Sequence, residues 1–148
     1  MAVSLRYYGN KEKLFAAAAT FDLRLPSLTG VPKTEYGPAL VRHFLDRWES
    51  DGTFVALLRA AVTNEAARDQ MRDIFVAQLA PVVATLCPAP AAAPDRAGLI
   101  ASQMFGLALC RYVLRLPPIT AMPAEKVVEW ISPTLQRYLT GPEESLTA

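Results

Sequence analysis

The sequence has few of the residues that build disulfide scaffolds or metal centres. It holds two cysteines, Cys87 and Cys110, and a single histidine, His43. Two distant cysteines are too few for a disulfide framework and are not spaced as metal ligands, so we interpret them as buried, reduced thiols, with a reactive pair as the alternative. One histidine far from both cysteines offers no zinc constellation. The sequence therefore predicts no metal and no cofactor.

Patterns typical of enzymes are also missing. The sequence contains no glycine-rich loop of the kind that cradles phosphate, and no serine, histidine and aspartate arrangement can be proposed with any specificity. Its carboxylates are scattered along the chain, without a pair suited to acid–base catalysis. We therefore predict that the chain is not an enzyme.

An excess of one charge and long hydrophobic runs are absent as well. The formal net charge is +1, so any contact with nucleic acid must be local. The longest apolar stretch, residues 97–116, contains Gln103, Arg111 and Arg115, which are costly in lipid. Residues 1–9 lack the apolar core of a signal peptide. We expect a cytoplasmic protein that does not enter the membrane.

What the sequence does have is apolar side chains at helical spacing. Hydrophobic residues make up 52% of the 148 residues, which is enough for the core of one domain. Their period is helical almost throughout, and no strand pattern is present. After the end of a short first helix, the spacing predicts helices over roughly 10–21, 35–49, 54–61, 63–82, 95–116 and 123–140. The sequence thus predicts an all-α bundle of about seven helices.

Prolines and polar residues mark where these helices meet. Residues 24–34 are rich in turn formers and give the one candidate boundary. Thr63 is expected to cap the helix after it, and Pro81 to kink that helix. Pro117 and Pro118 are expected to form a short turn that leaves the last two helices antiparallel. We therefore divide the chain into residues 1–24, a body of residues 35–140 and a tail of residues 141–148.

Two stretches resemble the TetR family of transcriptional regulators. Residues 3–15, Val-Ser-Leu-Arg-Tyr-Tyr-Gly-Asn-Lys-Glu-Lys-Leu-Phe, are similar to the end of its helix-turn-helix: a recognition helix, an aromatic pair, Gly, Ser or Asn, Lys, an acidic residue, any residue, Leu and Phe. Most of the body resembles one C-terminal subclass of the family. The runs that carry this second resemblance are residues 59–63, 102–107, 111–117 and 131–138.

The resemblance implies a repressor whose body binds a ligand and dimerises, preceded by a remnant of the DNA-binding head (residues 1–24). Family members carry further residues ahead of the recognition helix, so a misplaced start, a shortened chain and a natural remnant all stay open. Arg6, Tyr7, Tyr8 and Lys11 match positions on or near those that contact DNA. Because so short a helix is marginal alone, we expect weak, non-specific DNA binding or none. The alternative is a stand-alone dimeric module that binds a small molecule.

In the family, the ligand pocket lies between the middle helices and the first long C-terminal helix. The resemblance implies an apolar or aromatic effector, because the side chains expected there are large and mostly uncharged, although each of them also suits an ordinary core. Arg111 and Gln103 are the polar groups expected to orient a ligand, and a salt bridge from Arg111 to a carboxylate such as Glu129 is the alternative. His43 is a weaker candidate, expected on a solvated helix edge. The apolar candidates are Phe44, Trp48, Leu58, Met71, Phe75, Met104 and Leu107.

The last two predicted helices offer more apolar surface than one small domain covers, which favours self-association. By resemblance they form a four-helix bundle across a two-fold axis, so we expect a homodimer. The candidates for its interface are Leu107, Tyr112, Val128, Ile131, Leu135 and Tyr138.

Overall fold

The computed structural model describes residues 11–142, and within this range no strand occurs. The α-helices are α2 (Lys11–Ala19), α3 (Tyr36–Ser50), α4 (Thr53–Ala61), α5 (Glu65–Ile74), α6 (Ala80–Leu86), α7 (Ala93–Ala108), α8 (Pro117–Ala121) and α9 (Ala124–Thr140). Two 3₁₀ turns, η1 (Lys33–Glu35) and η3 (Pro90–Ala92), and two π-helical turns, η2 (Phe75–Leu79) and η4 (Leu109–Val113), complete the order.

The turn η2 joins α5 and α6 into one continuous helix, and η4 continues α7 without a break. Counted in this way, the described part of the chain contains seven helices, which confirms the predicted all-α bundle. None of them is long and apolar enough to cross a membrane.

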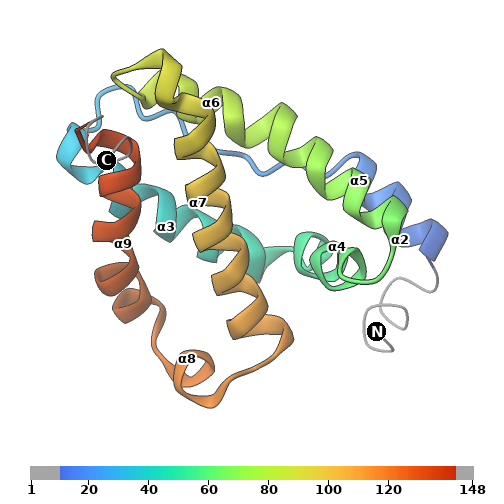
Figure 1. Ribbon diagram of the computed structural model, residues 1–148. Coiled ribbons are helices and arrows are strands. Elements are labelled where there is room, and N and C mark those ends of the chain that lie inside the picture. Colours follow the sequence, from blue (N-terminus) through green and yellow to red (C-terminus); the bar gives the residue numbers. More distant parts are fainter. Residues whose placement is uncertain (1–10, 143–148) are drawn as a thin grey trace.

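Figure 1 shows how these helices are arranged. α7 and α9 lie side by side and antiparallel, as predicted, and α8 lies in the connection between them. α3 crosses behind and packs most extensively against α9, whereas α4 packs against α5, and α6 packs against α7. The helix α2 lies against α4 and α5, at the far side of the molecule from α9.

The core is one large cluster of apolar side chains to which all the long helices contribute. In α3, Leu40, Phe44 and Trp48 recur every four residues and therefore share one helix face. That face is almost fully buried, with exposed fractions of 0%, 0% and 3%. Helical periodicity thus identified the inner side of α3 correctly.

The contact between α3 and α9 requires a glycine. A Cβ atom placed on Gly37 would lie 2.5 Å from the backbone oxygen of Ser132. The Gly37 N–H donates to Gln136 Oε1 at 2.7 Å, and Gln136 Nε2 donates to the Lys33 carbonyl at 2.6 Å. The side chain of Gln136 therefore ties α9 to the start of α3.

The same C-terminal end of α9 is also held by a buried arginine that the sequence analysis did not single out. Arg96 of α7 is 0% exposed, and its two terminal nitrogens donate to the carbonyl oxygens of Tyr138 (3.0 Å) and Gly141 (2.6 Å). The last carbonyls of a helix lack intrahelical partners and carry the negative end of its dipole. A guanidinium therefore suits this position although it has no carboxylate within ion-pair distance among the described residues.

The structure shows how the chain accommodates Pro81. The N–H of Ala80 bonds to the carbonyl of Phe75, five residues earlier, so the helix widens into the π-helical turn η2. Proline removes one donor from the helical ladder, and widening of this kind is a known way to absorb such an interruption. The widened turn also contains Gln78, whose side chain has a role described below.

Two predicted helix ends were wrong in detail. The cap of α5 is Asn64, whose side chain accepts from the N–H of Ala67 at 2.9 Å, and not the neighbouring Thr63. Pro117 and Pro118 open the short helix α8 instead of forming a simple turn. Proline fits a first helical position because the N–H it lacks would have no partner there.

Candidate functional site

The most prominent internal feature is an aromatic cluster, formed by Phe21, Phe44, Trp48, Phe54 and Phe105. The ring of Trp48 stacks on Phe54 with an interplanar angle of 14° and a centroid distance of 5.7 Å. Phe44 lies 5.3 Å from Trp48, and Phe105 of α7 meets Phe54 edge-on at 5.3 Å. Phe21 completes the cluster from the segment that follows α2. Three helices and one connecting segment thus converge on one aromatic centre.

The cluster contains a polar group without a partner. Trp48 Nε1 is buried, and no hydrogen-bond acceptor reaches it within the described part of the chain. Buried polar groups are nearly always hydrogen-bonded, so a buried N–H without an acceptor needs an explanation. An oxygen or nitrogen lone pair of a bound molecule, placed next to Trp48 Nε1, would supply the acceptor that this N–H lacks.

A polar edge borders the cluster where η4 meets α3. The hydroxyl of Tyr112 donates to Glu49 Oε2 at 2.6 Å, and the Tyr112 ring lies edge-on to Trp48 at 6.1 Å. Burial and the hydrogen bond to Glu49 raise the pKa of Tyr112 above its ordinary value, so the hydroxyl keeps its proton. This edge is therefore a neutral donor paired with a carboxylate.

Arg111 completes this edge, and its Nη1 and Nε already have partners. Its Nη1 donates to the carbonyls of Ile119 and Met122, each at 2.8 Å, and its Nε lies 3.7 Å from Glu49 Oε2. Arg111 therefore pairs with a carboxylate, as the alternative expected, but that carboxylate is Glu49 and not Glu129. Arg111 braces the connection through α8.

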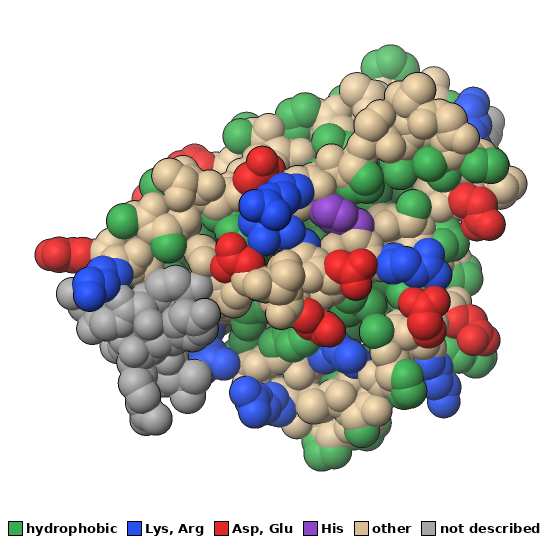
Figure 2. Space-filling view, turned by 180° about the vertical axis from the view of Figure 1, so that it is seen from behind, with side chains coloured by type: hydrophobic (Ala, Val, Ile, Leu, Met, Phe, Trp, Pro, Cys, Tyr) green, Lys and Arg blue, Asp and Glu red, His purple; other side chains and the backbone are tan. Residues whose placement is uncertain are grey.

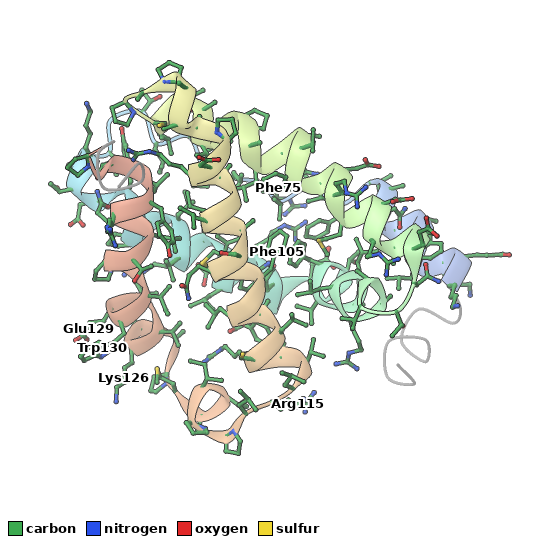
Figure 3. All side chains as sticks on the ribbon, in the orientation of Figure 1. Phe75, Phe105, Arg115, Lys126, Glu129 and Trp130 are labelled. Atoms are coloured by element: carbon green, nitrogen blue, oxygen red, sulfur yellow. The ribbon has the colours of Figure 1, made fainter. Side chains whose placement is uncertain are left out.

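The other predicted pocket residues lie in and around the core. Phe44, Trp48, Leu58, Met71, Met104 and Leu107 are buried, whereas Phe75 and Gln103 are partly exposed. Phe75 lies on the helix formed by α5, η2 and α6, and Phe105 lies on α7 (Figure 3). A groove of about 840 Å³ lies elsewhere, between α3 and α9, and none of the predicted pocket residues lines it. The pocket therefore stays a prediction.

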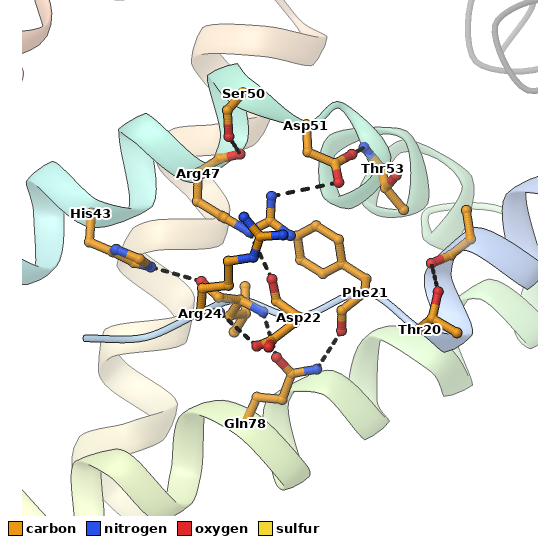
Figure 4. Close-up of polar contacts among 12 residues, drawn as sticks. Thr20, Phe21, Asp22, Arg24, His43, Arg47, Ser50, Asp51, Thr53 and Gln78 are labelled. Atoms are coloured by element: carbon orange, nitrogen blue, oxygen red, sulfur yellow. Dashed lines mark hydrogen bonds and ion pairs between the residues drawn. The ribbon is translucent and has the colours of Figure 1, made fainter. Parts of the chain in front are cut away.

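The connection from α2 to the body is fixed by side chains from two sides (Figure 4). From η2, Gln78 donates to the carbonyl of Phe21 at 2.7 Å and accepts from the N–H of Leu23 at 2.6 Å. From α3, Arg47 Nε donates to the carbonyl of Asp22 at 2.7 Å. The backbone of these three residues is thus bonded to both helices, although it forms no helix itself.

Two residues of α3 have larger roles here than the sequence suggested. His43 Nε2 lies 2.7 Å from the carbonyl oxygen of Leu23, and because a carbonyl only accepts, this nitrogen carries the proton. Arg47 is 8% exposed, places its guanidinium 4.5 Å from the centre of the Phe21 ring and lies 3.6 Å from Asp51. Arg47 follows Phe44 by three residues and Leu40 by seven, and residues at these spacings share a helix face, which was the signal available in the sequence.

The predicted dimer residues divide into two groups. Leu107, Val128 and Leu135 are 6%, 4% and 0% exposed, so the chain's own core already covers them. Tyr112, Ile131 and Tyr138 are partly exposed. The large apolar side chains exposed near this end of the described chain are Leu114, Leu116 and Trp130, and Trp130 is the most open of them at 68%.

Three of the predicted DNA-contact residues, Arg6, Tyr7 and Tyr8, lie outside the described residues. Lys11 is the first residue of α2 and is exposed. On the face that carries His43, basic and acidic side chains are interspersed, without a continuous basic surface (Figure 2). Among residues 11–142, no group of histidine, cysteine and carboxylate side chains is arranged to hold a metal ion.

The chain was compared with known proteins at three levels. Residues 34–139, from just before α3 almost to the end of α9, match the family described as tetracyclin repressor-like, C-terminal domain. Comparison with curated proteins and with solved structures gave no match.

Proposed function

The chain belongs to the tetracyclin repressor-like (TetR) family, and from this premise we propose that residues 35–140 are the effector-binding and dimerising part of a cytoplasmic transcriptional repressor. The single observation that carries the proposal is the aromatic cluster with the unpartnered N–H of Trp48. Stacked rings around a buried donor suit recognition of a small molecule. The role is regulatory and not enzymatic.

The effector class follows from the chemistry of the cluster. Its rings offer flat apolar surfaces, and its one free polar group is a donor. The proposed effector is therefore a planar aromatic molecule that carries a hydrogen-bond acceptor, such as a ketone or quinone oxygen. Phe75, Leu58, Met71 and Met104 would line its apolar surroundings, and Gln103 would add a polar contact.

The proposed dimer uses the outer faces of α7 and α9. Trp130 is exposed, Ile131 and Tyr138 are partly exposed, and α7 and α9 lie antiparallel as a four-helix bundle with a second copy would require. A DNA-binding head with Arg6, Tyr7, Tyr8 and Lys11 would connect to this body through the segment held by Gln78 and Arg47. An effector that binds more tightly at one distance between α3 and η2 would stabilise that arrangement. The segment held by Gln78 and Arg47 would then pass the change on to the head.

A ligand screen with matched variants tests the proposal. Thermal stabilisation is measured for the whole chain with a panel of planar aromatic ketones and quinones. Compounds that raise the melting temperature should bind at least about tenfold more weakly to Trp48→Phe, which removes one hydrogen bond to a buried donor. The control, Trp130→Phe, alters an exposed indole and should bind as the original chain does. If Trp48→Phe bound every stabilising compound unchanged, the cluster would not be the effector site.

A further inference from the structure

A groove on the surface of the molecule, separate from the buried aromatic cluster, has the dimensions of a ligand site. The groove between α3 and α9 measures about 840 Å³, which is within the range of small-molecule sites in proteins. Its apolar lining comes from both helices and from the segment ahead of η1. These apolar residues are Val31, Pro38, Ala39, Val128 and Pro133.

The charges in this groove do not balance. Three carboxylates, Glu35, Glu125 and Glu129, line it together with one guanidinium, Arg42, so it carries two net negative charges. Arg42 is committed to Glu125, because its Nε and Nη2 donate to the two carboxylate oxygens at 3.3 and 3.0 Å. Among the described residues, Glu35 and Glu129 have no cationic group within ion-pair distance.

The neutral polar groups of the groove strengthen this bias. Gln136 uses its amide on Gly37, Lys33 and Thr140, and Ser132 donates its hydroxyl to the Val128 carbonyl. Pro133 has no N–H, so the carbonyl of Glu129, four residues earlier, lacks its usual helical partner. Most of the unused hydrogen-bonding capacity in the groove therefore consists of acceptors.

We propose that the groove between α3 and α9 binds an amphipathic organic cation, a small molecule with an apolar body and a positively charged centre. Its body would lie against the apolar lining, and its charge would lie near Glu35 and Glu129. An anion of the same shape is repelled by the same carboxylates. This site is separate from the aromatic cluster, because the two share no residue, and it does not depend on the function proposed above.

A pair of ions that match in shape but differ in charge tests the proposal. Tetraphenylphosphonium and tetraphenylborate have nearly the same size and apolar surface. Isothermal titration of the whole chain at low ionic strength should show the phosphonium binding at least about tenfold more tightly than the borate, because the groove attracts only the cation. Added salt should weaken binding of the phosphonium, because salt screens exposed charges.

Variants locate the bound cation. Glu35→Gln and Glu129→Gln should each weaken phosphonium binding by about threefold to tenfold, as expected for one charge near another at a solvated surface. Glu65→Gln, an exposed carboxylate at the start of α5, is the control and should leave the affinity unchanged. Ala39→Phe places a ring in the groove and should abolish binding, and its thermal melt checks that the variant is folded.

Three results would overturn the proposal. Equal affinity for the two ions would show a purely apolar surface. Binding that Glu35→Gln, Glu129→Gln and Ala39→Phe all leave unchanged would place the cation elsewhere. An absence of phosphonium binding, together with loss of self-association in Glu129→Lys, would show that a second copy of the chain covers the groove.

Discussion

At the scale of single residues, polar side chains decide how the helix ends are held. Arg96 holds the last carbonyls of α9 from inside the protein, and Asp51 holds the start of α4 by accepting from the N–H of Thr53 at 2.9 Å. Both contacts satisfy backbone groups that a helix leaves free at its ends. Each can be removed by one substitution.

Arg96→Met keeps the apolar stem and removes the guanidinium. The carbonyls of Tyr138 and Gly141 then lose their donors in a buried place, so the free energy of unfolding should fall by about 1–3 kcal/mol. Urea denaturation measures the change. Arg68→Met, at an exposed arginine of α5, is the control and should stay within about 0.5 kcal/mol of the original chain. Equal stability of the two variants would contradict the role given to Arg96.

Asp51 should make stability depend on pH in the acid range. Burial alone would raise the pKa of Asp51, but the hydrogen bonds from Thr53 and the charge of Arg47 lower it overall. A lowered folded-state pKa stabilises the fold above the unfolded pKa of about 4, and this contribution is lost as the pH falls through the folded value. Asp51→Asn should therefore cost more stability at pH 7 than at pH 2, measured by urea denaturation. A cost that is the same at both pH values would exclude this contribution.

At the scale of elements, the contact between α3 and α9 leaves no room for a side chain at Gly37. Gly37→Ala brings a Cβ atom against the Ser132 backbone, which side-chain rotation cannot relieve. The free energy of unfolding should fall by about 1–3 kcal/mol, as for other overpacked contacts. Gly98→Ala in α7 is the matched control, because its Cβ atom meets nothing within 4 Å, and it should stabilise the chain by about 0.5–1 kcal/mol. Thermal or urea melts of both variants decide the point, and a stabilising Gly37→Ala would contradict the packing described.

The elements also show how far the sequence could predict the structure. The period of Leu40, Phe44 and Trp48 was sufficient to place α3 and its buried face, because helical spacing is a local property. The partners of Arg96 lie 42 and 45 residues away, so no local pattern could indicate that this arginine is buried. Charged residues are nearly always exposed, and sequence reasoning follows that rule.

The candidate site was predictable to a similar extent. Aromatic residues of α3 were expected near the site, and the structure gathers them into one cluster. The partner of Arg111 was not predictable, because the sequence gives no reason to prefer Glu49 over Glu129. Only the packing of η4 against α3 brings Glu49 close to Arg111. For the same reason, the sequence could not show that Leu107, Val128 and Leu135 lie inside the chain's own core.

At the scale of the whole molecule, the proposed dimer makes a prediction about self-association. Trp130 is 68% exposed on α9, whereas Val76 is 60% exposed on η2, away from the proposed interface. Trp130→Glu places a charge in that interface and should shift the chain towards monomer in sedimentation experiments. Val76→Glu adds the same charge at a similar exposure and should not change the sedimentation. Equal behaviour of the two variants would remove α9 from the interface.

The central claim, that the aromatic cluster receives the effector, can be tested with the two indole N–H signals of the chain by ¹H–¹⁵N NMR. Trp130 is exposed and serves as the internal reference, and Trp130→Phe assigns the two signals. A stabilising aromatic compound with an acceptor group should move the Trp48 signal downfield, because its free N–H gains a hydrogen bond, and should leave the Trp130 signal in place. A compound that saturates the protein while the Trp48 signal stays where it was would contradict the claim.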